Sequence, residues 1–301
     1  MKTRASGFVF AIGVIISSGA IAESYVEDFE GGLGSSNFFK WGSEAYTDIS
    51  SDKAYSGNES LRFRFMGDTD LNEDAWAEKR FELDRIYSEL WIRYKLWVPE
   101  NYFHRNGDGP DNNKGLIMLW SDDYSGISHT SLHFTRPRDI NSSGESASNP
   151  GGSALYGTWK PNSGVAFNFF NPYDLSDDSP SMDEMSMGIL SSDRGRWIDW
   201  VIHAKVSDLH IEQNDIDGPG NGKLQVWKDG ELIYNVTDAT NYTEVDGMNG
   251  WDQGYILGWA NSGFDETTYM HVDDFMIGVS AEDVGFELMK PSFGNVIKQI
   301  D

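Results

Sequence analysis

The clearest pattern in the chain is an alternation of apolar and polar residues with a period of two. In residues 88–98 every second side chain is apolar, and the side chains between them carry rings and charges. The apolar positions are Leu90, Ile92, Tyr94 and Leu96. Strict alternation places successive side chains on opposite faces of a β-strand. Residues 128–135 and 197–207 follow the same rule, so we predict strands in all three segments.

Turn signals separate these segments. Residues 223–227 and 231–236 both read as strands and flank Lys228-Asp229-Gly230, which predicts a β-hairpin. No long amphipathic helical stripe is present. We therefore predict about ten to fourteen short strands, almost no helix, and an all-β fold, a jelly-roll sandwich of two antiparallel sheets.

The ends of the chain define its expected organisation. Lys2 and Arg4 precede an apolar run at 8–16, and Ala20-Ile21-Ala22 supplies a small-x-small cleavage site, so residues 1–22 are predicted to be a secretory signal peptide. The run is too short for a membrane anchor, which is the weaker alternative. We expect residues 23–280 to form one domain, whose first and last strands pair, and 281–301 to form a loose tail.

Composition narrows the classes of function. The 301 residues include 48 Asp and Glu against 23 Lys and Arg, which gives a formal net charge of −25. Binding to nucleic acid or to an anionic membrane requires a basic face, so the acidic composition argues against both partners. Zero cysteines exclude disulfides and thiolate chemistry. We expect an exported monomer that is extracellular or periplasmic, does not insert into a membrane and is stabilised by packing alone.

Several segments resemble a known group. They are Ser60-Leu61-Arg62-Phe63, residues 89–94, Gly195-Arg196-Trp197-Ile198-Asp199-Trp200 and the hairpin at 223–230. Together they resemble concanavalin A-like jelly rolls, and the hairpin resembles that of secreted polysaccharide lyases of the heparin-lyase, glucuronan-lyase and alginate-lyase type. The resemblance implies a concave glycan groove and β-elimination on a uronate-containing polysaccharide. The Gln-Ile-His strand of many alginate lyases and the Glu-x-Asp-x-x-Glu strand of laminarinase-like hydrolases are both absent.

The polar face of residues 89–97 is a candidate substrate-binding surface. It presents Trp91, Arg93, Lys95 and Trp97 in one row. Rings stack on sugar faces, and cations neutralise uronate carboxylates. The alternative is a solvated face on which the cations balance neighbouring acids.

The second candidate strand carries imidazoles. His129, Ser131 and His133 share one face, and Arg136 and Arg138 follow. β-Elimination requires a cation or an amide that neutralises the uronate carboxylate, a base and an acid. We predict His133 as the base, with His129 as second choice, Arg136 as a catalytic cation and Arg138 as a substrate-binding cation. A histidine held by structural hydrogen bonds remains the alternative for each imidazole.

The strand before it supplies Lys114, which we expect to lie beside the histidine strand because consecutive strands tend to pair. One lyase group has a similar lysine strand followed by Ser-x-Arg, whereas this chain has Ser131-Leu132-His133. We name Tyr124 as the candidate acid, with Tyr156 and Tyr255 left open. Trp120 is assigned to the substrate-binding surface, and Trp159 and Trp259 are further candidates for it.

Calcium is an expected structural ion. Glu27 on the first strand and Asp274 on the last resemble the end-strand calcium site of many jelly rolls, and calcium binds carboxylate and carbonyl oxygens. The alternative is a pair of solvated acids. No organic cofactor is expected.

Three functions compete. A lyase requires a base, an acid and a cation around one surface, a non-catalytic glycan-binding protein requires only rings, and a glycoside hydrolase requires a carboxylate pair that we do not find. The lyase hypothesis depends on one expectation, namely that Trp91, Arg93 and His133 share a single concave surface.

Overall fold

The structure is a computed structural model. It describes residues 24–32, 39–42, 45–70, 73–105, 113–121, 129–135, 152–159, 168–170, 187–208, 220–239, 244–245 and 248–288. The predicted signal peptide (1–22) lies outside these residues. So do most residues of 138–152 and 171–195, two segments whose composition predicts long loops. Within the described ranges, no helix is long and apolar enough to cross a membrane.

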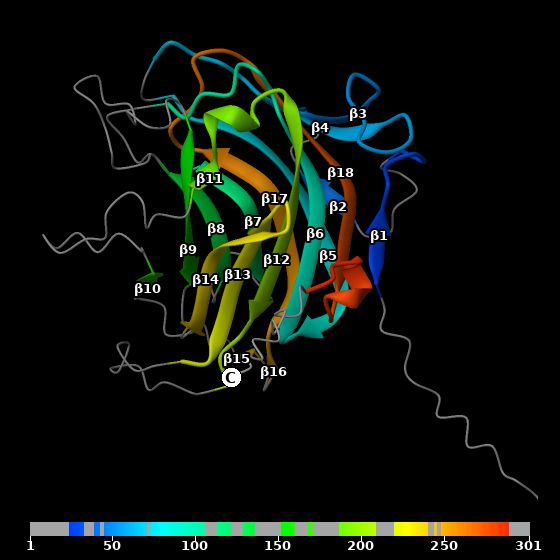
Figure 1. The fold of residues 1–301 in the computed structure, drawn as a ribbon, viewed down its shortest axis with the longest axis vertical. Coiled ribbons are helices and arrows are strands. Elements are labelled where there is room, and N and C mark those ends of the chain that lie inside the picture. Colours follow the sequence, from blue (N-terminus) through cyan, green and yellow to red (C-terminus); the bar gives the residue numbers. More distant parts are fainter. Residues whose placement is uncertain are drawn as a thin grey trace, which may run out of the picture.

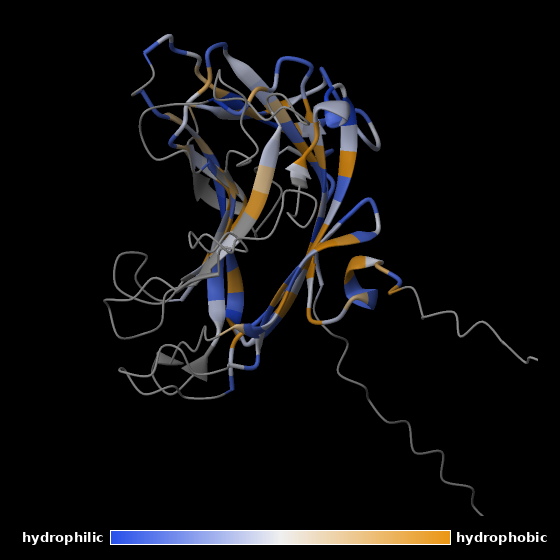
Figure 2. Ribbon diagram, turned by 60° about the vertical axis from the view of Figure 1, so that its left-hand side comes forward, coloured by the Kyte–Doolittle hydropathy of each residue, from blue (hydrophilic) through white to orange (hydrophobic). Residues whose placement is uncertain are grey.

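Two antiparallel sheets pack against each other as two layers (Figure 1 and Figure 2). Sheet A contains, in spatial order, β14 (Glu231–Ala239), β13 (Gly222–Lys228), β12 (Arg196–Lys205), β6 (Glu89–Val98), β18 (Thr268–Gly278), β4 (Ser60–Phe65) and β3 (Thr47–Ser50), and β1 (Tyr25–Glu27) also pairs with β18. Sheet B contains β10 (Asn168–Phe170), β9 (Ser153–Trp159), β8 (His129–Thr135), β7 (Asn113–Trp120), β17 (Trp251–Ala260), β5 (Ala75–Tyr87) and β2 (Phe39–Gly42), and β11 (Met187–Ile189) pairs with β9. The remaining elements are the ribbon β15 (Glu244–Val245) and β16 (Met248–Asn249) and the 3₁₀ turns η2 (Ser191–Asp193) and η3 (Glu282–Val284).

The predicted all-β jelly-roll fold is confirmed. The segments predicted at 88–98, 128–135 and 197–207 correspond to β6, β8 and β12. The predicted hairpin joins β13 to β14 through Asp229 and Gly230, whose φ angles of 51° and 84° match the turn type that Asp-Gly favours. The described residues contain eighteen strands, more than we predicted, because several edge strands of two to four residues are too short to show a pattern.

The core lies between the two sheets and follows from the alternation. The inner faces of β6 and β12 are fully buried, as the period of two requires. The inward-facing residues of these strands are Leu90, Ile92, Tyr94, Leu96, Val98, Ile198, Trp200, Ile202 and Ala204. Tyr94 crosses to sheet B, where its hydroxyl donates a hydrogen bond of 3.0 Å to the carbonyl of Leu116. The outer faces of the sheets are thereby left for other partners.

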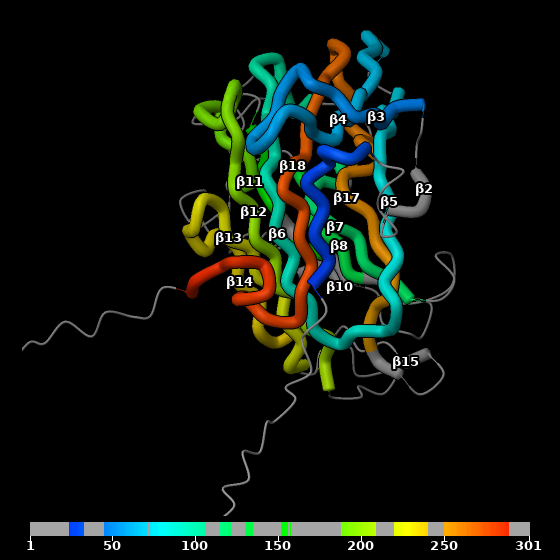
Figure 3. The backbone as a smooth tube through the Cα atoms, turned by 90° about the vertical axis from the view of Figure 1, so that its right-hand side faces the viewer, coloured from blue at the N-terminus to red at the C-terminus, as the bar shows by residue number. Residues whose placement is uncertain are grey.

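The first and last strands pair, as the sequence predicted. Tyr25 of β1 lies opposite Ile277 of β18, and Glu27 lies opposite Phe275. Figure 3 shows β1 running alongside β18 on the outside of the sandwich. This pairing brings residues from both ends of the described chain into one sheet.

The start of the expected tail is docked rather than loose. After β18 the chain folds back over the outer face of sheet A (Figure 3), where Val284 and Phe286 pack with Trp91 and Trp227 in a second hydrophobic cluster. The Phe286 ring lies 5.3 Å from the Trp227 ring. The packed part of the chain therefore extends to Phe286.

Replacing Phe286 with alanine should lower the free energy of unfolding by about 3 kcal/mol, because it removes a largely buried ring from this cluster. Chemical denaturation checks this prediction. Leu288→Ala is the matched control, since Leu288 is 51% exposed and its truncation should change stability by less than about 0.5 kcal/mol. Equal stabilities of the two variants would show that the segment does not contribute to the fold.

His271 of β18 should make the free energy of unfolding depend on pH. The imidazole is buried and its Nδ1 lies 3.0 Å from Ser60 Oγ. Burial, reinforced by the charge of Arg62, lowers the pKa of His271 from 6.5 to about 4. The unfolded chain therefore takes up this proton at a higher pH than the folded protein does, and stability falls as the pH decreases from 6.5 towards 4.

We expect this single group to account for a loss of about 3 kcal/mol across that range, and His271→Gln to remove it. Urea denaturation of both proteins at intervals between pH 7 and pH 4 measures the effect. If the free energy of unfolding depended on pH in the same way in wild type and variant, His271 would not be the group responsible.

Candidate active site

A row of side chains crosses the outer face of sheet B. Arg80 of β5 lies opposite Tyr255 of β17, Tyr255 lies opposite Met118 of β7, and Met118 lies opposite Ser131 of β8. Residues directly opposite each other in neighbouring strands point to the same face. Met118, Trp120 and Tyr255 accordingly form a hydrophobic cluster separate from the core between the sheets. This outer face therefore has its own packed layer.

Ser131 and His133 form the polar part of this face. Both are buried, and Ser131 Oγ lies 2.7 Å from His133 Nε2. The tautomer decides which of the two atoms donates this hydrogen bond. In either case the hydrogen bond orients the imidazole. The alternation of β8 therefore places on this face an oriented side chain that can accept or donate a proton.

The register places further predicted residues around this pair. His133 lies opposite Lys114 on one side and opposite Tyr156 of β9 on the other. His129 lies opposite Trp120. The prediction that Lys114 lies beside the histidine strand is confirmed. Lys114, His129 and Tyr156 therefore hold positions next to, or on the same strand as, His133.

Arg80 is a cation of this face whose side-chain contacts are known. Its Nε lies 2.5 Å from Oε1 of Glu78, and the carbon of its guanidinium lies 5.8 Å from the centroids of both the Tyr255 and the Trp120 ring. Trp120 belongs to β7, two strands from β5, so the guanidinium and the Trp120 ring approach each other over the intervening strand β17. Glu78 is 2% exposed, and such a buried ion pair holds the arginine in one orientation.

Together these groups can perform acid–base chemistry on an anionic substrate. Histidine is the side chain whose ordinary pKa is nearest to neutrality, so it can accept a proton under physiological conditions. A guanidinium provides hydrogen bonds matched to a carboxylate. Because His133 and Arg80 are already oriented by Ser131 and Glu78, they need little reorganisation during a reaction.

The other predicted row lies on the opposite sheet. Trp91, Arg93, Lys95 and Trp97 belong to β6 of sheet A and occupy its outer face, with the core of the sandwich between them and His133. Our expectation that Trp91, Arg93 and His133 share one surface is therefore wrong. The alternation correctly placed each row on an outer face, but it could not say which sheet each strand would join.

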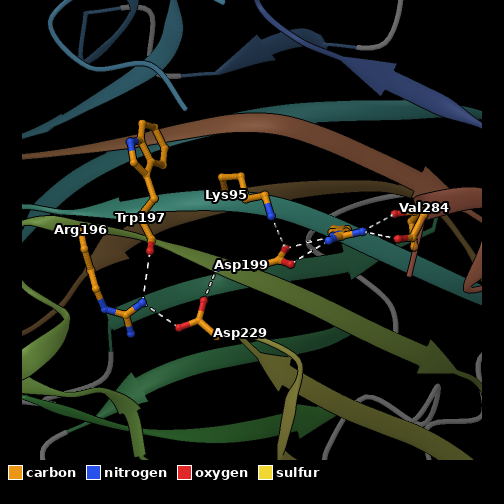
Figure 4. Close-up of polar contacts among 8 residues, drawn as sticks. Lys95, Arg196, Trp197, Asp199, Asp229 and Val284 are labelled. Carbon is orange, nitrogen blue, oxygen red and sulfur yellow. Dashed lines mark hydrogen bonds and ion pairs between the residues drawn. The ribbon is translucent and has the colours of Figure 1, made fainter. Parts of the chain in front are cut away.

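The row on β6 has structural partners. Arg93 bonds Asp199 at 2.8 Å and also donates hydrogen bonds to the carbonyls of Val284 and Gly285, and Lys95 lies 3.1 Å from Asp199. Figure 4 shows Lys95 pointing towards Asp199. Burial alone would raise the pKa of Asp199, but the hydrogen bonds from both cations outweigh it and lower the pKa. These charges bind one another and the docked C-terminal segment.

The aromatic members of the row are packed as well. Trp91 stacks on His203 of β12 with the ring centroids 4.1 Å apart. Trp97 meets Trp197 edge-on at 5.8 Å, and Lys53 lies 4.3 Å from the centroid of the Trp97 ring. The structure thus gives this row a role in covering sheet A.

Three predicted site residues cannot be placed. Tyr124, Arg136 and Arg138 lie outside the described residues. Their assigned roles stay predictions.

The expected calcium ligands lie close in register, because Glu27 is opposite Phe275, the neighbour of Asp274. Glu27 accepts a hydrogen bond from the amide of Phe29, and Asp274 accepts one from the hydroxyl of Ser56. Throughout the described part of the chain, no group of three or more acidic or histidine side chains is arranged to hold a metal ion. Calcium is also bound by backbone carbonyl oxygens, so the calcium site stays a prediction, and we derive no step from it.

Comparison with known proteins places this geometry in context. A family model described as Polysaccharide lyase matches residues 29–256. A search of the curated proteins found no match. Among solved structures, an endo-β-1,4-glucuronan lyase from the fungus Trichoderma reesei is similar with a TM-score of 0.51 and 13% identity, covering 82% of this chain and 94% of that chain. An alginate lyase, vAL-1 from Chlorella virus, has a TM-score of 0.48 and 8% identity over 78% of this chain and 89% of its own. The similarity to the fungal enzyme shows a shared fold.

Proposed function

Because the chain belongs to the polysaccharide lyase family, we propose that it cleaves a uronate-containing polysaccharide by β-elimination on the outer face of sheet B. One observation carries the proposal: the buried Ser131–His133 pair lies on the same face of the same sheet as the oriented guanidinium of Arg80. This arrangement supplies a base and a cation that can bind the uronate carboxylate, and it needs no residue of sheet A.

The reaction makes defined demands on these groups. A base removes the proton from C5 of the uronate, the electron pair of that bond forms the C4–C5 double bond, and the C4–O bond breaks. The departing oxygen then takes a proton from an acid. Neutralising the carboxylate stabilises the negative charge that develops during proton removal.

We assign His133 as the base and Arg80 as the partner of the carboxylate. Ser131 keeps the imidazole in place through its 2.7 Å hydrogen bond. Glu78 keeps Arg80 in place through the ion pair. Lys114 and Tyr156 flank His133 in register and are our candidates for assisting charge neutralisation and for protonating the leaving oxygen.

The choice of an acidic substrate rests on chemistry and on the relatives. The fungal enzyme that shares the fold is named as an endo-β-1,4-glucuronan lyase, and glucuronan is a uronate polymer. A net charge of −25 repels polyanions at long range, so binding must depend on local cations such as Arg80 and on salt that screens the remaining charge. We further propose that the protein is exported, as the N-terminal segment predicts.

The test is a product analysis. Purified protein is incubated with glucuronan and with alginate, and both the ultraviolet absorbance of unsaturated uronate ends and the number of new reducing ends are followed. A lyase produces the two in equal amounts. New reducing ends without that absorbance would indicate a hydrolase, and the absence of both would favour a binding protein.

A further inference from the structure

A pair of stacked tryptophans marks another part of the outer face of sheet B. Trp76 of β5 and Trp259 of β17 lie directly opposite each other, with ring centroids 5.8 Å apart and planes inclined by 23°. Tyr46 meets the Trp76 ring edge-on at 6.2 Å. Trp259 is 41% exposed and is the only exposed tryptophan among the described side chains. Since burying an indole is favourable, a stacked pair that leaves the Trp259 ring exposed points to a ligand.

The pair is continuous with the candidate active site. Trp76, Glu78 and Arg80 alternate along β5 and therefore face the same side. Trp259 and Tyr255 of β17 share that side, because the Trp259 ring stacks on Trp76 and the Tyr255 ring contacts Arg80. Four residues of extended strand separate Trp76 from Arg80, which corresponds to about 13 Å. A polymer bound over Arg80 along these strands would pass over the tryptophans at a sugar other than the one being cleaved.

Polar groups flank the pair just beyond the ends of the same two strands. Asn261 donates a hydrogen bond of 3.4 Å to Asp74, and Asp74 is exposed. A carboxylate and an amide at the edge of a ring platform can bond sugar hydroxyls. The negative charge of Asp74 also disfavours a uronate carboxylate on that side, so the ring would present its hydroxyls there.

We propose that Trp76 and Trp259 form a distal subsite that stacks one sugar ring of the polysaccharide, with Asp74 and Asn261 bonding its hydroxyls. The proposal deepens the proposed function and rests on it for the identity of the ligand. The subsite contributes binding to long chains and takes no part in proton transfer.

The experiment compares wild type with Trp259→Ala in gels containing glucuronan or alginate and in lyase kinetics on the same polymers. We expect about tenfold weaker retardation and about tenfold higher KM with unchanged kcat, because a lost ring contact of about 1.4 kcal/mol is a factor of ten. The retardation and the KM of Trp259→Phe should lie between those of wild type and Trp259→Ala. Tyr269→Ala is the control, since Tyr269 is 40% exposed but lies on β18 of sheet A.

The outcomes separate the two proposals. If the polymers retard wild type but not Trp259→Ala and no unsaturated product forms, the subsite stands and the lyase assignment falls. If product forms with the same KM and retardation for both proteins, the subsite is overturned and the lyase assignment stands. Absence of retardation of wild type by either polymer also overturns the subsite.

Discussion

Replacing His133 with glutamine is expected to reduce kcat for β-elimination by about 10²- to 10⁴-fold, because the reaction loses its general base. Glutamine is close in size and can still hydrogen-bond Ser131, so the buried site should remain packed. Steady-state rates, followed by the ultraviolet absorbance of the product, measure the effect.

The matched control is His203→Gln. His203 is also buried and hydrogen-bonded, but it lies on sheet A, where it contacts Glu89 and Gln225. It should keep wild-type turnover per folded molecule. If the His133 variant were as active as this control, His133 would not be the base.

Replacing Arg80 with methionine should lower kcat/KM by about 10²- to 10³-fold, the range typical for removing one oriented donor at a developing charge. The substitution also deprives the buried carboxylate of Glu78 of its ion pair, which can destabilise the fold. The double variant Arg80→Met/Glu78→Gln removes that difficulty and should show the same kinetic loss.

Arg85→Met is the control for the arginine experiment. Arg85 lies on the same strand but is exposed and lies 4.9 Å from the centroid of the Tyr87 ring instead of over the candidate site. Its kcat/KM should match that of wild type. A wild-type value for the double variant would remove Arg80 from the site.

Local patterns were sufficient to predict the strands and one neighbourhood of the site. The alternation of β6, β8 and β12 and the Asp-Gly turn were readable because they depend only on adjacent residues. Lys114 was correctly placed beside His133 because β7 and β8 are consecutive in the chain.

The pairing of strands that are distant in the sequence could not be predicted from local patterns. β6 pairs with β12 and β18, which come more than a hundred residues later, and that pairing places Trp91 and Arg93 on sheet A. Their rings and charges look like a binding surface in the sequence, but they serve the docking of Val284 and Phe286. When a C-terminal segment packs onto the outer face of a sheet, no periodic pattern in the sequence shows which strands it will cover.

Arg80 and Glu78 were missed for a related reason. The alternation in β5, with Ala77 and Phe81 inward and Glu78 and Arg80 outward, was available as a signal for this strand. The contact of Arg80 with Tyr255 depends on the pairing of β5 with β17, which lies far away in the sequence. Only the folded sheet brings these groups together.

The most direct test of the account is a crystal structure of His133→Gln bound to a uronate oligosaccharide. The account predicts that the sugar lies on the outer face of sheet B, with a carboxylate within hydrogen-bonding distance of Arg80 and C5 of that ring next to residue 133. An oligosaccharide bound over β6 and β12 of sheet A instead would contradict it.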